Sequence, residues 1–196
     1  MFDVQDFIAR CREFVGGPDG ARQVLDLMRS VIGDADGIKT ALVGEGESQR
    51  AIRDLTLFRS PELFVLNATV PPHFKSPPHD HCMWAVIGIY QGQEDNTFYR
   101  RSAEGLKEIN RREIRAGDAI LLGPEVIHAI ANPLGSSTLG LHVYGGDIFA
   151  ARRSMWHPRT GEELPYDVPQ FFKWCTELAE ASRAVSKTLG GPDDER

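Results

Sequence analysis

The amino-acid sequence predicts a mainly β protein, an antiparallel barrel or jelly roll, with helices at both ends. Between residues 55 and 150, short runs rich in Val, Ile, Leu, Phe and Tyr alternate with Pro and Gly, which is typical of many short strands joined by tight turns. Before residue 50 and after residue 169, apolar residues recur at spacings of three and four, which is typical of amphipathic helices. The 196 residues suffice for one domain, so we expect a single domain spanning 1–196.

The N-terminal part, residues 1–50, is expected to be helical. Apolar residues between positions 2 and 15 fit one helix face, and Gly16-Gly17 ends this pattern. A second apolar stripe lies between Pro18 and Gly33. We expect a helix with these bounds, because proline favours the first turn of a helix and glycine its end. We expect residues 34–50 to form a connection that contains a short helical turn.

The central part, residues 55–150, is expected to form the barrel core. The predicted strands cover residues 63–70, 84–90, 97–101, 106–112, 119–122, 127–131 and 138–144. Residues 169–189 again show helical spacing, and we expect this helix to pack outside the barrel. Residues 192–196 are expected to be disordered.

Composition excludes several function classes. The net charge is −6 and the basic residues are scattered, so nucleic acid is not an expected partner. No stretch approaches the roughly 18 consecutive apolar residues of a membrane span, and acidic residues interrupt the apolar N-terminus where a secretory signal would be basic and then apolar. The three cysteines are far apart, which predicts neither a disulfide framework nor a paired-cysteine zinc site. We therefore expect a cytoplasmic protein, of an oligomeric state that the sequence leaves open.

Three histidines predict a metal site inside the barrel. His79 and His81 are two residues apart, and such residues on an extended strand project to the same face. His128 lies in another predicted strand. Three imidazoles gathered in a barrel leave open metal positions, which a metal that binds both substrate and O2 needs. Asp80, between two of these histidines, faces the other way and is expected to be a structural hydrogen-bonding residue.

Residues 76–149 resemble the two sequence motifs of the cupin superfamily. The first motif pairs His-x-His with a glutamate ligand and a later glycine, and the second runs from Gly-Asp to His-x-x-x-Asn. The matching residues are His79, His81 and Gly92 in the first motif and Gly117, Asp118, His128 and Asn132 in the second. Residues 82–88 offer no carboxylate at the glutamate position. The resemblance implies a cupin double-stranded β-helix, which is a jelly-roll barrel.

The chain more closely resembles the thiol dioxygenases, the family of cysteine dioxygenase and 3-mercaptopropionate dioxygenase, which lack that glutamate and keep three histidines. This resemblance implies Fe(2+) held by His79, His81 and His128. It also implies an enzyme that adds both atoms of O2 to the sulfur of a small thiol, giving a sulfinic acid.

A third segment is similar to the Ser-x-His-x-Tyr segment of these enzymes, whose hydroxyl, imidazole and phenol form a hydrogen-bonded line beside the iron. His142 and Tyr144 match it and are the expected catalytic residues, while the serine position is Gly140. Thr138 or Ser137 would replace that serine only if the strand register allowed it. Mammalian-type cysteine dioxygenases carry a cysteine that can bond to the tyrosine; here that position is Val86, so no crosslink is expected.

A small thiol acid needs a cation for its carboxylate, and a guanidinium can donate two parallel hydrogen bonds. The 3-mercaptopropionate type resembles this chain in having an arginine after the His-x-Tyr segment, which makes Arg153 the expected substrate-binding residue and Arg152 a weaker candidate. Alternatively, the two arginines are a solvated pair on a loop. Because no acidic residue is evident to receive an ammonium group, the sequence favours a mercapto-acid such as 3-mercaptopropionate over cysteine.

Two other functions remain open at this level. A three-histidine cupin dioxygenase that cleaves a carbon–carbon bond would share the metal without needing His142 and Tyr144. A cupin that binds a metal or small ligand without turnover belongs to a different class of protein. Imidazole sites also accept Zn, Ni, Cu and Mn, so the sequence does not fix which metal accompanies the purified protein.

Overall fold

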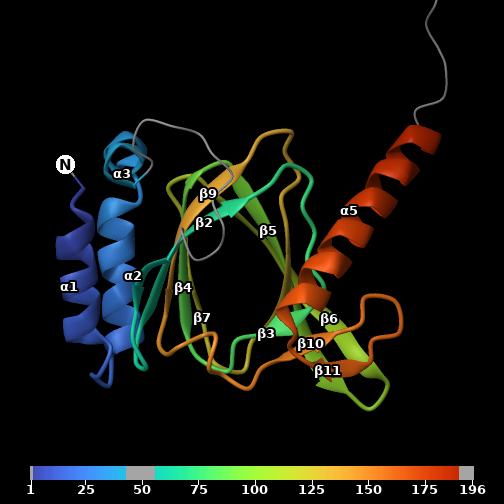
Figure 1. Ribbon diagram of the computed structural model, residues 1–196, viewed down its shortest axis with the longest axis horizontal. Helices are drawn as coiled ribbons and strands as arrows, with labels where there is room; N and C mark the ends of the chain where they lie inside the picture. Colours follow the sequence, from blue (N-terminus) through green and yellow to red (C-terminus); the bar gives the residue numbers. More distant parts are fainter. Residues whose placement is uncertain (1, 43–55, 190–196) are drawn as a thin grey trace, which may run out of the picture.

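A computed structural model describes residues 2–42 and 56–189 of the chain. Two antiparallel sheets face each other, with three helices on one side and one long helix on the other (Figure 1). The predicted fold class, mainly β with helices at both ends, is therefore confirmed. In the part of the chain that the structure describes, no helix is both long and apolar enough to cross a membrane.

The elements have the following bounds. The helices are α1 (Val4–Phe14), α2 (Gly20–Val31), α3 (Ala35–Leu42) and α5 (Val168–Leu189). The strands are β1 (Thr56–Arg59), β2 (Phe64–Val70), β3 (His79–Asp80), β4 (Ala85–Gln91), β5 (Gln93–Ser102), β6 (Gly105–Arg115), β7 (Ala119–Leu122), β8 (Ile127–Ala131), β9 (Thr138–Tyr144), β10 (Ser154–Trp156) and β11 (Glu163–Pro165).

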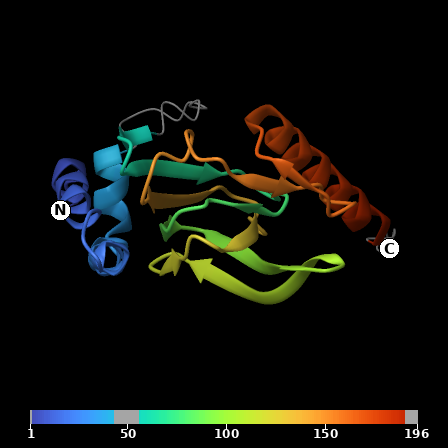
Figure 2. The same ribbon diagram turned by 90° about the horizontal axis from the view of Figure 1, so that it is seen from below.

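The strand order is that of a jelly roll. Among the described residues, the first sheet has the order β1-β2-β9-β4-β7 and the second the order β11-β10-β3-β8-β5-β6. Strands distant in sequence thus lie side by side: β9 pairs with both β2 and β4, and β8 pairs with both β3 and β5. The chain passes repeatedly between two sheets that stack on each other (Figure 2), which is how a double-sheet jelly roll encloses an interior.

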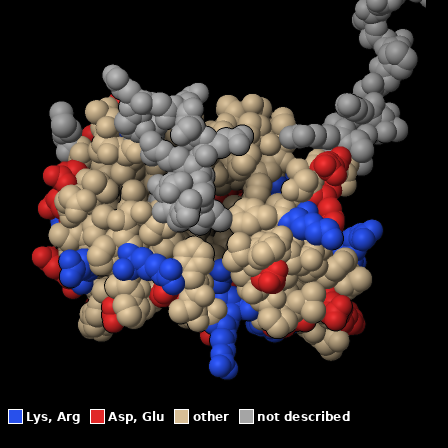
Figure 3. Space-filling model, in the orientation of Figure 1, with Lys and Arg blue, Asp and Glu red and all other residues tan. Residues whose placement is uncertain are grey.

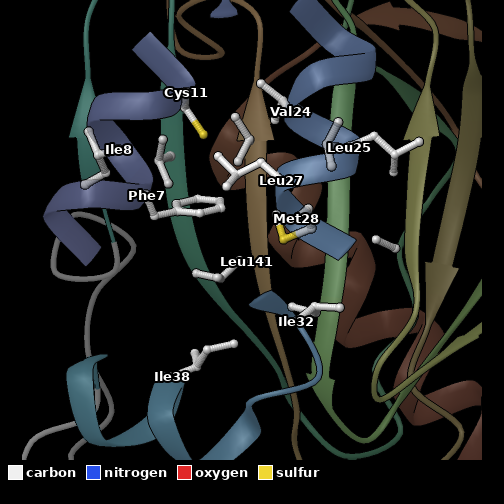
Figure 4. Close-up of a cluster of buried hydrophobic side chains, with 14 of the residues drawn as sticks. Phe7, Ile8, Cys11, Val24, Leu25, Leu27, Met28, Ile32, Ile38 and Leu141 are labelled. Atoms are coloured by element: carbon white, nitrogen blue, oxygen red, sulfur yellow. The ribbon is translucent and has the colours of Figure 1, made fainter. Parts of the chain in front are cut away.

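Helices α1 and α2 cover the outer face of the first sheet (Figure 4). Phe7, Leu27 and Met28 pack there against outward-facing Leu141 of β9. Strand β4 is consequently buried on both faces. Gly88 permits the close approach of α2, since a Cβ at this position would lie 2.6 Å from the Met28 sulfur.

Helix α5 begins beside the second sheet. Its first turns bury Phe171, Trp174 and Cys175 against Met155 of β10, with Tyr166 packed at the edge of this cluster. The inner faces of both sheets form a separate apolar cluster that includes Ile87, Ile89, Ile120 and Leu122. The polar side chains of the candidate site lie between this apolar cluster and the beginning of α5.

All seven predicted strands are present, most within a few residues of their predicted bounds, and the helices at both ends are confirmed. The prediction missed β1, β3, β10 and β11, which are short strands of two to four residues. Strand β5 also begins at Gln93, earlier than predicted. Residues 43–50 of the predicted connection and the predicted disordered end at 192–196 lie outside the described residues.

Candidate metal centre

His79, His81 and His128 lie together inside the barrel. His79 of β3 is the direct register partner of His128 of β8. Strand β3 ends at Asp80, so His81 lies in the following turn, where Cys82 has a φ of 53°. All three rings are buried, and one nitrogen of each lies within 4.8 Å of the others. The predicted gathering of the three histidines is confirmed, although His81 does not reach it from the same strand as His79.

All three imidazoles are held neutral. Burial lowers the pKa of His79 to about 4. Burial, followed by the neighbouring histidines, lowers the pKa of His81 and of His128 well below the usual value. A neutral imidazole has a lone pair for a metal, whereas an imidazolium has none.

Acceptor groups orient two of these rings. Nδ1 of His79 lies 3.1 Å from the carbonyl oxygen of Pro77, and Nδ1 of His128 lies 2.7 Å from Oδ1 of Asn96. Each Nδ1 therefore carries the hydrogen and donates it, which leaves the Nε2 lone pair available. Nε2 of His128 lies 3.4 Å from Nε2 of His81. Three buried, neutral imidazoles whose nitrogens converge in this way fit a divalent metal ion.

Asp80 has the structural role that the sequence predicts. Its Oδ1 accepts a hydrogen bond of 2.8 Å from the backbone N–H of Ser154, and its Oδ2 lies 3.4 Å from the Arg101 guanidinium. The carboxylate thus joins β3 to β10 on the face away from the histidines. The exposed Cys82 donates its thiol hydrogen to Oδ1 of Asp80 at 3.5 Å.

His142 and Tyr144 belong to β9 and lie next to the three histidines. The rings of Tyr144 and His81 are perpendicular, with centroids 5.1 Å apart. Nδ1 of His142 is 3.1 Å from the phenolic oxygen of Tyr144. Burial lowers the pKa of His142 to about 4, and burial raises the pKa of Tyr144, so both groups are neutral at physiological pH.

The described residues offer no hydroxyl at the serine end of the expected hydrogen-bonded line. Nε2 of His142 is buried and has no hydrogen-bond partner among the described residues. A Cβ built on Gly140 would lie 3.4 Å from this nitrogen but only 2.8 Å from the carbonyl oxygen of Gly88, so a side chain does not fit without a shift of β4. Thr138 does not substitute, because its hydroxyl donates to the carbonyl oxygen of Gln93 at 2.7 Å.

Arg153 is buried at 9% exposure, while Arg152 is exposed. Its guanidinium carbon lies 3.6 Å from the ring centroid of Tyr166. Within residues 2–42 and 56–189, no carboxylate lies within ion-pair distance of Arg153. Burial raises the pKa of Tyr144, and the positive charge of Arg153 opposes this effect. The Tyr166 ring is in turn 6.3 Å from the ring of His79, centroid to centroid, so the guanidinium lies on the His79 side of the site. The two arginines are therefore not a solvated pair: Arg152 is exposed, whereas Arg153 is buried.

Sequence reasoning missed two polar residues on the inner face of β5. Nδ2 of Asn96 donates to Oε1 of Glu94 at 3.0 Å, and the Asn96 oxygen contacts His128 as described above. Glu94 is fully buried, burial raises its pKa to about 7, and its Oε2 has no partner among the described residues. Glu94 is thus a buried acidic residue that the sequence reasoning did not consider when it favoured a mercapto-acid over cysteine. Alternation of Glu94, Asn96 and Phe98 is the sequence signal that could have revealed them.

No known protein family profile matches the chain. Among solved structures, a cupin superfamily protein from Desulfitobacterium hafniense is similar at 16% identity, over 47% of this chain and 74% of that chain, with a TM-score of 0.39. DMSP lyase DddQ from Ruegeria pomeroyi is similar at 19% identity, over 51% of this chain and 46% of the lyase, with a TM-score of 0.40. An uncharacterised protein with a double-stranded β-helix domain from Klebsiella pneumoniae is similar at 14% identity, over 57% of this chain and 81% of that one, with a TM-score of 0.40.

Proposed function

We propose that the chain is an iron-dependent dioxygenase that adds both atoms of O2 to the sulfur of a small thiol to give a sulfinic acid. One observation carries this proposal: a buried phenol lies beside three converging neutral imidazoles, and a buried guanidinium without a described carboxylate partner lies on the Tyr166 ring, which neighbours His79. Fe(2+) bound by His79, His81 and His128 would supply adjacent positions for a thiolate and O2 and would lower the pKa of the thiol. The sulfur loses four electrons and O2 gains them, so no further reductant is needed.

The hydrogen bond between His142 and Tyr144 supports a donor role for the phenol. If His142 carries its hydrogen on Nδ1, it donates to the phenolic oxygen and leaves the phenolic hydrogen free for the substrate. Nε2 is then an unpaired acceptor, which a buried site tolerates better than an unpaired N–H. The opposite tautomer would leave a buried N–H without a partner. The geometry therefore favours a Tyr144 hydroxyl that points its hydrogen at the reacting groups.

Arg153 supports a substrate that carries a carboxylate. A guanidinium in a buried position favours an anionic partner, and Arg153 has none within the described residues. Its guanidinium lies on the Tyr166 ring, whose centroid is 6.3 Å from that of His79, so a carboxylate bound there would hold the substrate on the His79 side of the site. Glu94 removes the argument against an ammonium group, so the substrate class is a small mercapto-acid, either 3-mercaptopropionate or cysteine.

Oxygen uptake tests the proposal. The protein is loaded with Fe(2+) under anaerobic conditions and mixed with O2 and 3-mercaptopropionate, cysteine or cysteamine, with 3-hydroxypropionate as the control that lacks sulfur. We expect uptake of one O2 for each sulfinate formed with a mercapto-acid, and none with the hydroxy-acid. Iron binding without uptake for any thiol would contradict the proposal and favour a binding protein, while uptake only with a diketone or phenol would favour carbon–carbon cleavage.

A further inference from the structure

Glu94 and Asn96 form a buried line of hydrogen bonds that ends on His128. Oε1 of Glu94 accepts from Nδ2 of Asn96 at 3.0 Å, and Oδ1 of Asn96 lies 2.7 Å from Nδ1 of His128. Glu94 is 0% exposed and Asn96 is 1% exposed. Bulk solvent does not reach these side chains, so the hydrogen bonds of the Asn96 amide are made to Glu94 and His128.

The chemistry of the line fixes the direction of each bond. Oε1 of Glu94 accepts from Nδ2 of Asn96, both when the carboxyl is ionised and when its hydrogen is on Oε2, so the amide of Asn96 turns its NH2 toward Glu94. The amide oxygen of Asn96 then faces His128, whose Nδ1 must donate. The hydrogen of His128 therefore lies on Nδ1, and Nε2 keeps the lone pair that faces His81. If the amide were reversed, its NH2 would face Nδ1 and favour a hydrogen on Nε2, and that tautomer cannot bind a metal through Nε2.

We propose that Glu94 is a positioning residue for the metal ligand His128, which acts by fixing the orientation of the Asn96 amide. This inference rests on the metal site of the proposed function and not on the thiol chemistry. Burying a carboxyl group whose second oxygen has no described partner opposes folding. An apolar residue at position 94 would avoid that cost but would leave the buried Nδ2 of Asn96 without an acceptor. Glu94 is therefore explained by its pairing with Asn96, which sets the orientation of that amide.

Three variants separate orientation from charge. Glu94→Met removes the acceptor at similar size, Glu94→Gln keeps an oxygen that accepts from Asn96, and the double variant Glu94→Met with Asn96→Asp places at position 96 a carboxylate that only accepts. Each variant is purified with a chelator, and its thermal unfolding is measured first. E94M removes the unpartnered Oε2 but leaves the buried Nδ2 of Asn96 without an acceptor. These two effects oppose each other, so we expect E94M to unfold near the parental temperature.

Affinity for Co2+, measured by competition with a coloured chelator, is the first readout. E94M should bind Co2+ about 10- to 100-fold more weakly than the parent, the usual effect of losing a group that orients a ligand. E94Q and the double variant should stay within about threefold of the parent. The second readout is the His128 tautomer in the metal-free protein, from long-range 1H–15N NMR: Nδ1–H in the parent and in E94Q, and loss of that single tautomer in E94M.

Two results would overturn the role of Glu94. Parental Co2+ affinity and tautomer in E94M would show that Asn96 needs no help, and equal weakening in E94Q and E94M would show that the charge of Glu94 acts instead of its acceptor. Failure of the parent to bind Co2+ is a distinct result, because it is seen before any variant is compared and would overturn the metal site itself together with this role.

Discussion

His142 should make the metal-free protein sensitive to acid, and its replacement should reduce that sensitivity. The ring is fully buried, and burial lowers its pKa from the usual 6.5 to about 4. Between these values the unfolded chain binds a proton on this imidazole while the folded protein does not. The free energy of unfolding therefore falls as the pH drops from about 6.5 toward about 4.

The magnitude follows from the two pKa values. Each pH unit within this interval is worth ~1.4 kcal/mol for one group. Between about pH 7.5 and about pH 5, His142 alone should lower the free energy of unfolding by roughly 2 kcal/mol. Glu94 acts in the opposite direction, since burial raises its pKa to about 7 and stability is lost as the pH rises from about 4.5 to about 7. Comparison of the parent with one variant cancels this contribution.

The assay is urea unfolding of the chelator-treated parent and of His142→Gln at both pH values. Glutamine does not titrate and keeps a polar group for Tyr144, so the variant should lose roughly 2 kcal/mol less than the parent on acidification. His73→Asn is the matched control, because it removes an exposed histidine and Asn tolerates its φ of 59°. Equal acid sensitivity of the parent and His142→Gln would refute the argument that His142 is buried in its neutral form.

The remaining predictions concern activity and metal content. His79→Ala, His81→Ala and His128→Ala should each lose stoichiometric iron, measured by metal analysis, and retention of full iron in any one would remove that histidine from the site. Tyr144→Phe should keep the iron and lose much of the activity or uncouple oxygen uptake from sulfinate formation; unchanged coupled turnover would leave Tyr144 with a packing role alone. Arg153→Ala should raise the KM for a mercapto-acid far more than for neutral cysteamine, since only the acid loses an ion pair, and equal effects on both thiols would contradict the assignment.

The metal site was predictable from the sequence because its residues lie in local patterns. Strand alternation was the reason for grouping His79 with His81, and the two rings do lie together, although β3 ends at Asp80 and His81 is placed by the following turn. His142 and Tyr144 were predicted from the resemblance to the Ser-x-His-x-Tyr segment. The convergence of the three histidines was a prediction about the barrel, and it is confirmed by the pairing of His79 with His128 and by the grouping of one nitrogen from each ring within 4.8 Å.

Residues that depend on the exact beginning of a strand were not found. The predicted strand began at residue 97, whereas β5 begins at Gln93, so Glu94 and Asn96 were never placed on its inner face. Charged residues are rare in cores, so Glu94, which is followed by Asp95, would be predicted to be exposed. Only the register of β5 against β8, which sets Phe98 opposite His128, brings these two residues into the barrel.

The two sides of the candidate site have different origins in the chain. The three histidines come from the two cupin-like motifs, and Tyr144 comes from the third matched segment, on β9. Arg153 and Tyr166 flank β10 and β11, two short strands that add to the edge of the second sheet and that sequence patterns do not reveal. The ring of Phe171, from the first turn of α5, lies 5.1 Å from His79 on the same side. The surroundings of the Arg153 guanidinium thus come from β10, β11 and the start of α5, and not from the histidine motifs. The three histidines alone therefore do not determine which substrate is bound. The substrate must be argued from the residues of this C-terminal segment.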